Sequence, residues 1–176
     1  MKNLQQSLLL MMALSMVFIS CDDEDETSQL QAVNDEQEIT EKVQLLFNYV
    51  DSFNWEGLHN EVMADSVLFD MSSLGQGPPQ MLSAEQITQG WATNYENLQV
   101  DEVFHLTGNI VVTVRGNEAD AYCYSEATLF REAATRGQTV SFSGDYNLRF
   151  VRQDNGWRMN YEQYNVRFIQ GNLTLE

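Results

Sequence analysis

Four long segments in the second half of the chain have the pattern of β-strands, and they restrict the fold more than any other feature. They span 100–114, 118–132, 139–152 and 157–170. In the third segment apolar residues alternate with polar ones, which predicts one buried face and one solvated face. Short turn sequences separate the segments, so we expect an antiparallel meander.

Glycines mark both the turns and the bends of this meander. Asn155-Gly156 separates the last two segments and predicts a primed hairpin turn, which needs positive φ at both central residues. Strands this long are expected to curve strongly, with Gly108 and Gly144 as bend points.

The preceding region has a helical pattern. From about Glu36 to Phe53 apolar residues recur at steps of four and three, which predicts one helix with an apolar stripe, begun by an Asn34 cap. A second short helix is predicted around Trp55, and a brief strand over 66–70.

The clearest helix start lies further on. Ser83 and Gln86 have the spacing of a capping box, and the helix they begin is predicted to reach about Asn97. Three helices followed by a four-strand meander predict an α+β domain, in which one curved antiparallel sheet wraps around the helices.

The first 20 residues have the layout of an export signal. Lys2 precedes an apolar run over 8–19, and Ser20 precedes Cys21. The run is too short for a spanning helix, so it predicts a cleaved signal peptide. Residues 17–21 resemble a lipobox, which implies lipidation of Cys21 and a membrane anchor held by acyl chains. The alternative is an ordinary signal peptide with a chance cysteine.

An acidic stretch follows, and 21–35 is predicted to be a solvated tether. It resembles the surface-export signal of Bacteroidetes lipoproteins, which implies an outer-membrane anchor; the alternative is a plain spacer. The net charge of −17 disfavours nucleic acid as a partner, because phosphate backbones would repel the chain. Only Cys123 remains besides Cys21, so the domain must be stable without an internal disulfide.

The order helix, helix, short strand, helix and four strands resembles the cone of the nuclear transport factor 2-like superfamily, and its SnoaL-like group above all. The resemblance covers the predicted domain 36–171 and leaves 172–176 as a C-terminal tail. The matching features are the stretches 51–55, 104–109 and 156–159 and the hairpin at Gly116. It implies a ligand pocket between helices and sheet.

His105 is the first polar candidate for that pocket, since an imidazole near neutrality acts as general acid or base. The alternative is a structural core or rim histidine. Against the dehydratases of this superfamily, the resemblance puts Cys123 where they have a second histidine and Met71 where they have a tyrosine. It puts Gly144 and Tyr146 in place of a serine and an asparagine, and Phe53 and Asn54 near a Tyr-Asp pair.

We therefore predict that His105, Cys123 and Tyr146 point into one cavity walled by Phe53, Met71 and Trp91. The strand of His105 argues against this, because Ile110, Val112 and Val114 place even-numbered residues inward. Both patterns hold only if a bulge near Gly108-Asn109 inserts one residue and reverses the alternation.

Other groups of residues give weaker evidence for a functional site. Similarity to the steroid isomerases of this superfamily implies a general base at the position next to Asp70. A shift of one residue along a strand places the Asp70 side chain on the opposite face of the sheet. His59 is expected to be a solvated helix-end residue. The two histidines are far apart and no phosphate-binding glycine pattern occurs, so we predict neither a metal nor a cofactor.

Two functions remain open. The favoured one is a ligand-binding domain for a small, largely apolar molecule, without catalysis; the alternative is a lyase or isomerase with His105 as acid or base and Tyr146 as orienting donor. A second titratable group facing His105 inside the cavity would discriminate between them. If no carboxylate, tyrosine or thiol lies within hydrogen-bond reach of His105, binding without catalysis is the better interpretation. A homodimer is also predicted, through Tyr122, Tyr124 and Tyr164 on the outer face of the sheet.

Overall fold

The computed structural model describes residues 23–176, and Asp35–Glu176 form one compact unit. The predicted signal peptide and the predicted lipidation at Cys21 lie outside the described residues. Within those residues no helix combines the length and apolar character needed to cross a membrane.

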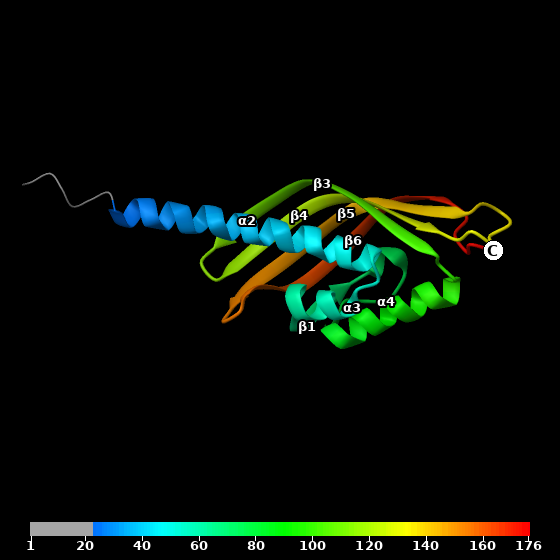
Figure 1. Ribbon diagram of the computed structural model, residues 1–176, viewed down its shortest axis with the longest axis horizontal. Coiled ribbons are helices and arrows are strands. Elements are labelled where there is room, and N and C mark those ends of the chain that lie inside the picture. Colours follow the sequence, from blue (N-terminus) through cyan, green and yellow to red (C-terminus); the bar gives the residue numbers. More distant parts are fainter. Residues whose placement is uncertain (1–22) are drawn as a thin grey trace, which may run out of the picture. The chain divides into compact units, whose positions relative to one another are not determined.

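One six-stranded sheet forms the framework of this unit (Figure 1). Its spatial order is β2-β1-β6-β5-β4-β3, and every neighbouring pair is antiparallel except β1 and β6, which are parallel. The strands are β1 (Met63–Asp70), β2 (Gln80–Ser83), β3 (Glu102–Arg115), β4 (Glu118–Phe130), β5 (Thr139–Gln153) and β6 (Gly156–Gly171). The four predicted strands are confirmed to within two residues at each end.

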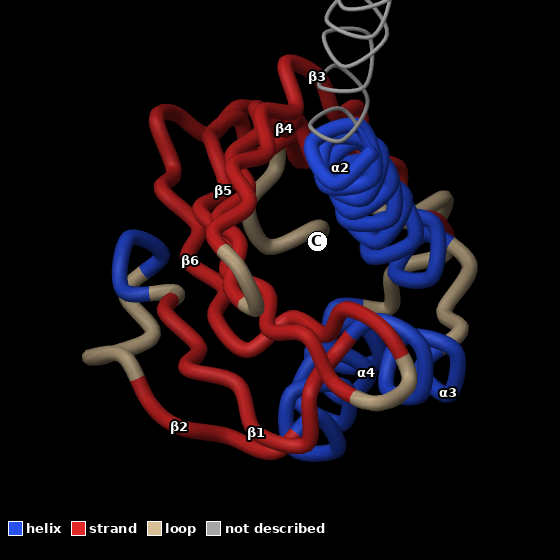
Figure 2. Tube along the Cα trace, turned by 90° about the vertical axis from the view of Figure 1, so that its left-hand side faces the viewer, coloured by secondary structure: helices blue, strands red, loops and turns tan. Residues whose placement is uncertain are grey.

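Within the unit Asp35–Glu176, helices cover the concave face of the sheet (Figure 2). The helices of the chain are α2 (Asp23–Asp51), which enters this unit at Asp35, α3 (Trp55–Gly57), a π-helical turn (Leu58–Val62) and α4 (Ala84–Leu98), and a 3₁₀ turn (Ser72–Leu74) follows β1. The fold is therefore the predicted α+β arrangement of a curved sheet around helices.

The core lies between the stripe of α2 and the inner face of the sheet. Ile39, Val43 and Leu46 of α2 are at most 1% exposed. Trp157 and Phe150, from β6 and β5, are fully buried in the same cluster. Burying each such side chain contributes about 1.5–3 kcal/mol, so this contact holds the helix against the sheet.

The start of the first helix differs from the prediction. α2 begins at Asp23 rather than near Glu36, and Asn34 is an exposed residue inside the helix rather than its cap. The stretch lacks glycine and proline and contains glutamate, glutamine and alanine, which favour helix even without a buried face. A tethering role for 21–35 stays a prediction.

Two local features were misjudged from the sequence. The hairpin at Asn155-Gly156 is present, but only Gly156 has positive φ (99°), so the predicted turn type is wrong. The short strand β2 was not predicted, because its four residues pair only with the edge of β1 and none of them is fully buried.

Three irregularities bend the long strands. On β3 the register shifts between Gly108 and Val111, and Asn109 has φ of 53°, so the predicted bulge is confirmed. β6 has one extra residue at Asn160 and another at Arg167, the latter opposite Gly144. Each extra residue reverses which side chains face inward.

The bulge at Asn160 overturns one prediction about the outer face. Trp157 and Met159 point inward before it, and Glu162 and Tyr164 are buried after it, at 1% and 3% exposed. Tyr164 was expected on the outer face, but it lies inside. Residues 172–176 also pack in the domain, since the Arg131 guanidinium donates to the carbonyl of the fully buried Leu175.

Candidate functional site

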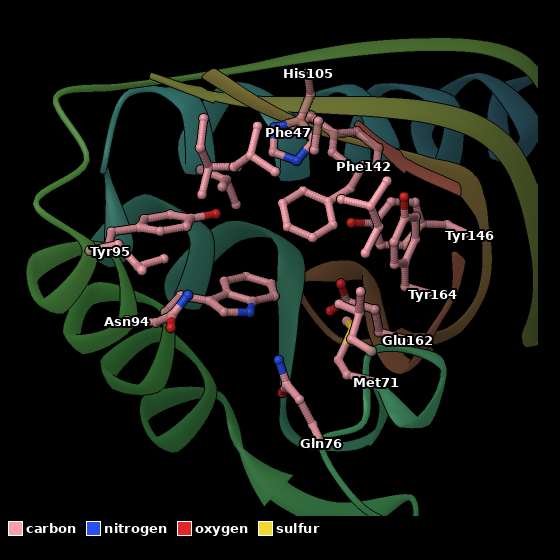
Figure 3. Close-up of a pocket in the computed structure, with 18 of the residues that line it drawn as sticks. Phe47, Met71, Gln76, Asn94, Tyr95, His105, Phe142, Tyr146, Glu162 and Tyr164 are labelled. Carbon is pink, nitrogen blue, oxygen red and sulfur yellow. The ribbon is translucent and has the colours of Figure 1, made fainter. Parts of the chain in front are cut away.

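One cavity of about 340 Å³ lies inside the curl of the sheet, between the strands and the helices α2 and α4 (Figure 3). Its walls are mostly aliphatic and aromatic. The polar groups among them are few: Gln76, Asn94, Tyr95, His105, Tyr146, Glu162 and Tyr164. A mostly apolar cavity with a few placed polar groups is the usual form of a small-molecule site.

His105 reaches this cavity because of the bulge in β3. Before the bulge odd-numbered residues such as Val103 face inward, and after it even-numbered residues such as Val112 do. The imidazole therefore points from β3 toward the cavity, and 5% of the His105 side chain is exposed. The ring of Phe47 packs against it at 5.1 Å between centroids.

Asp51, the last residue of α2, holds the imidazole in place. Its Oδ1 lies 2.5 Å from Nδ1 of His105, and its Oδ2 accepts a hydrogen bond from the His105 backbone N–H at 3.0 Å. One carboxylate thus fixes both the ring and the backbone of the same residue.

The end of α2 explains how Asp51 comes to this position. Phe53 adopts φ of 54° and ends the helix, and the side chain of Asn54 begins α3 by accepting from the N–H of Gly57. Asp51 is four residues after Phe47, so helical geometry places both on the face that meets β3.

The pairing sets the chemistry of the imidazole. A carboxylate only accepts hydrogen bonds, so Nδ1 is the donor to Asp51, and the neutral ring is held in the tautomer with its proton on Nδ1. Nε2 then carries the free lone pair. Among the described residues His105 forms no other side-chain hydrogen bond, so Nε2 is available to a ligand as a proton acceptor.

A second polar group lines the cavity from β6. Glu162 is 1% exposed, and its Oε2 has no hydrogen-bond partner in the described part of the chain. Burial raises the pKa of this carboxyl from 4.5 to about 8, because the charged form is poorly solvated there. Glu162 is therefore mostly a neutral carboxylic acid at pH 7.

Tyrosines complete the polar lining. Burial and then the neighbouring Glu162 hold the pKa of Tyr146 well above its usual value. Burial, followed by the charges of Asp51 and Glu162, raises the pKa of Tyr95 strongly. Both hydroxyls therefore stay protonated and are donors near neutral pH.

The structure brings together four of the six residues expected at the pocket. Met71, Trp91, His105 and Tyr146 line the cavity. Phe53 does not: its positive φ turns the ring out, where it is 36% exposed and contacts Trp55 and Tyr95.

Cys123 is also absent from the lining. It is fully buried in the core beside Tyr146, its partner in the β4–β5 register, and burial raises the pKa of its thiol to about 12. Such a thiol is an inert core group.

Asp70 has a structural role. Its carboxylate accepts from the backbone and side chain of Ser72 and from Gln163, and these hydrogen bonds, Ser72 first, lower its pKa. It caps the turn after β1. Among the side chains that the structure describes, no group of three or more histidine, cysteine or acidic residues is placed to hold a metal ion.

Sequence reasoning missed Asp51 and Glu162. For Asp51 a signal existed, since it follows Phe47 by one helical turn, but the resemblance drew attention to Phe53 and Asn54 instead. For Glu162 no local signal existed, because its inward direction depends on the bulge at Asn160.

Comparison with known proteins agrees with this geometry. A family model described as a SnoaL-like domain matches residues 31–161. No curated protein sequence matches the chain.

Solved structures share the fold at low identity. A Kribbella flavida protein superposes with a TM-score of 0.74 at 20% identity, covering 79% of this chain and 95% of its own. A Novosphingobium aromaticivorans protein described as nuclear transport factor 2-like with a cystatin-like fold gives 0.68 at 20%, covering 84% and 92%. A hexachlorocyclohexane dehydrochlorinase of Novosphingobium barchaimii gives 0.63 at 12%, covering 86% and 95%.

Proposed function

The chain belongs to the family of SnoaL-like domains, and from this premise we propose that its pocket removes a proton from a small, largely apolar molecule. The reaction class is that of a lyase or an isomerase. His105 is the general base, Asp51 positions it, and Tyr146 helps to orient the substrate.

The observation that carries the proposal is the contact of 2.5 Å between Asp51 and His105 at the wall of the cavity. Binding without catalysis was favoured from the sequence, and a second titratable group at His105 was the feature that would discriminate. Asp51 is not among the residues that line the cavity, but its carboxylate lies within hydrogen-bond reach of His105, so the geometry favours the catalytic alternative.

Physical chemistry explains what the pair contributes. The Asp51 carboxylate stabilises the imidazolium that forms when Nε2 takes a proton, and the two hydrogen bonds hold the ring in one orientation. A base placed in this way contributes about 10²–10⁴ in rate. The apolar walls select the substrate by shape and exclude water. A dehydrochlorinase among the similar structures supports elimination on this fold.

We also propose that the domain is held at the cell envelope by lipid on Cys21. The support is the sequence of the leader alone.

A proton-exchange experiment tests the catalytic proposal. The protein is incubated in D₂O with a panel of small ketones, β-hydroxy ketones and alkyl chlorides, and NMR follows exchange or elimination at carbon. We expect turnover of at least one compound by the wild type, near-complete loss in His105→Gln, and about 10²-fold loss in Asp51→Asn, whose amide favours the wrong tautomer.

The matched control is Asp154→Asn in the exposed β5–β6 turn, which should keep full activity. If the wild type and His105→Gln behave alike on every compound while chemical-shift changes still report binding, the pocket binds without catalysis.

A further inference from the structure

Glu162 is not explained by the function proposed above. It is a carboxyl almost completely enclosed by protein, it lines the cavity, and it forms no hydrogen bond to the described residues. A buried polar group without a partner is destabilising, so a purely structural role has no energetic basis here.

Among the residues that the structure describes, the titratable groups beside Glu162 are donors, and none of them is a cation. The titratable groups that face it are Tyr95 of α4, Cys123 of β4 and Tyr146 of β5. No arginine, lysine or histidine contributes to its titration, which burial alone determines. An unpaired carboxylate is not stable in such a place, whereas a neutral carboxylic acid is, and it offers one O–H donor.

The direction of these groups points to a ligand. Figure 3 shows the Glu162 carboxyl and the Tyr146 hydroxyl directed into the cavity from the β5–β6 side, while His105 enters from β3. Tyr146 has no hydrogen bond to the residues that the structure describes, so both donors are free for the same acceptor. A ligand oxygen that has two lone pairs and carries no hydrogen can accept a hydrogen bond from each of these two donors.

We propose that the Glu162 carboxyl and the Tyr146 hydroxyl form a subsite for a carbonyl oxygen, so that the ligands of this pocket are small, largely apolar carbonyl compounds. This rests on the proposed function and names its substrate class. When Nε2 of His105 takes a proton from the carbon beside the carbonyl, the C–H electron pair forms the C=C bond of an enolate. The negative charge moves to the oxygen held by Glu162 and Tyr146.

The test compares two probes of the same shape. 2-Acetylnaphthalene carries C=O where 2-isopropenylnaphthalene carries C=CH₂, so the ratio of their dissociation constants isolates the oxygen. We expect the wild type to bind the ketone about tenfold more tightly, as one to two hydrogen bonds provide. Calorimetry at pH 6.5 measures both constants.

Substitutions show which residues cause the preference for the ketone. Glu162→Leu should reduce the ratio to about one, and Glu162→Gln, which keeps an N–H donor, should retain part of it. Tyr146→Phe should lower it several-fold. Tyr161→Phe is the control: this tyrosine neighbours Glu162 on β6, but it does not line the cavity and packs against Arg149, so its loss should leave the ratio unchanged.

The pH dependence of the ratio of dissociation constants can be measured on the wild type and provides a second test. The wild-type ratio should fall as pH rises through about 8, while the ratio of Glu162→Gln should not. The groups that face Glu162 stay neutral in this pH range. Burial raises the pKa of Cys123 to about 12, and it raises the pKa of Tyr95 and Tyr146 above the usual value of 10.

Three results would overturn the proposal: no ketone preference in the wild type, an unchanged preference in Glu162→Leu, or equally tight binding of the matching alcohol, 1-(2-naphthyl)ethanol. The outcome is independent of catalysis, because His105→Gln should keep the ketone preference. A pocket that prefers the ketone but exchanges no proton would refute the function proposed above and leave this subsite standing.

Discussion

Replacing Glu162 with glutamine is expected to change how the stability of the protein depends on pH. The carboxyl is fully buried, and burial raises its pKa from 4.5 in the unfolded chain to about 8 in the folded one. Between these values the unfolded chain releases the proton and the folded chain keeps it. Stability is therefore complete below about pH 4.5 and declines as pH rises toward 8.

The size of the effect follows from the two pKa values. Their difference, multiplied by about 1.4 kcal/mol per pH unit, gives about 5 kcal/mol lost by the wild type between pH 4 and pH 9. Glutamine fills the same volume and does not titrate. The free energy of unfolding of Glu162→Gln should therefore exceed that of the wild type by an amount that grows with pH.

Urea denaturation at unit steps from pH 5 to pH 9 measures this difference. The fluorescence of Trp157, which is fully buried, reports unfolding. Comparing the two proteins at each pH cancels the other titrating groups. Glu118→Gln on the exposed start of β4 is the control, and its difference from the wild type should stay constant within about 0.5 kcal/mol.

Parallel curves for the wild type and Glu162→Gln over this range would refute the reasoning. They would show that the folded protein solvates the Glu162 carboxylate as well as water does. The carboxyl would then be ionised at neutral pH and unable to donate to a ligand oxygen.

Three further outcomes are expected. Ser83 accepts from the N–H of Gln86 at 3.1 Å in a complete capping box, so Ser83→Ala should lower the free energy of unfolding by about 1 kcal/mol in urea denaturation; an unchanged midpoint would contradict the cap. Cys21→Ser should abolish lipidation, and a wild-type mass in the detergent phase would refute the anchor. Tyr122 and Tyr124 pack at 5.4 Å on the outer sheet face, where a dimer should form; light scattering that gives a monomer mass at micromolar concentration would exclude it.

The strands were predictable because their signals are local. Glycine-containing turns separate them, and the alternation within β5 follows from residues that are neighbours in the chain. The α4 start at Ser83 was equally local, since the capping box needs only four residues. The same local reasoning failed at the start of α2. Asn34 is a residue type that caps helices, but nothing in the residues after it requires the helix to begin there.

The site was only partly predictable because its key contacts are long-range. Asp51 and His105 are 54 residues apart, and nothing near either residue indicates the other. The inward direction of His105 was predicted from the resemblance, and its conflict with Ile110 and Val112 predicted the bulge that the structure contains. Nothing in the sequence of β6 predicts the extra residue at Asn160, so the inward directions of Glu162 and Tyr164 did not follow from the sequence.

The inward positions of His105 and Glu162 thus depend on two single-residue insertions in the sheet. Without the extra residue near Asn109, His105 would face away from Asp51 and from the cavity. Without the one at Asn160, Glu162 would face solvent, where a carboxylate is well hydrated and ionised at neutral pH. A regular sheet with this composition would still bury an apolar core, but its cavity would lack both the imidazole and the carboxylic acid. The bulges are therefore the features of the fold that give the cavity its chemistry.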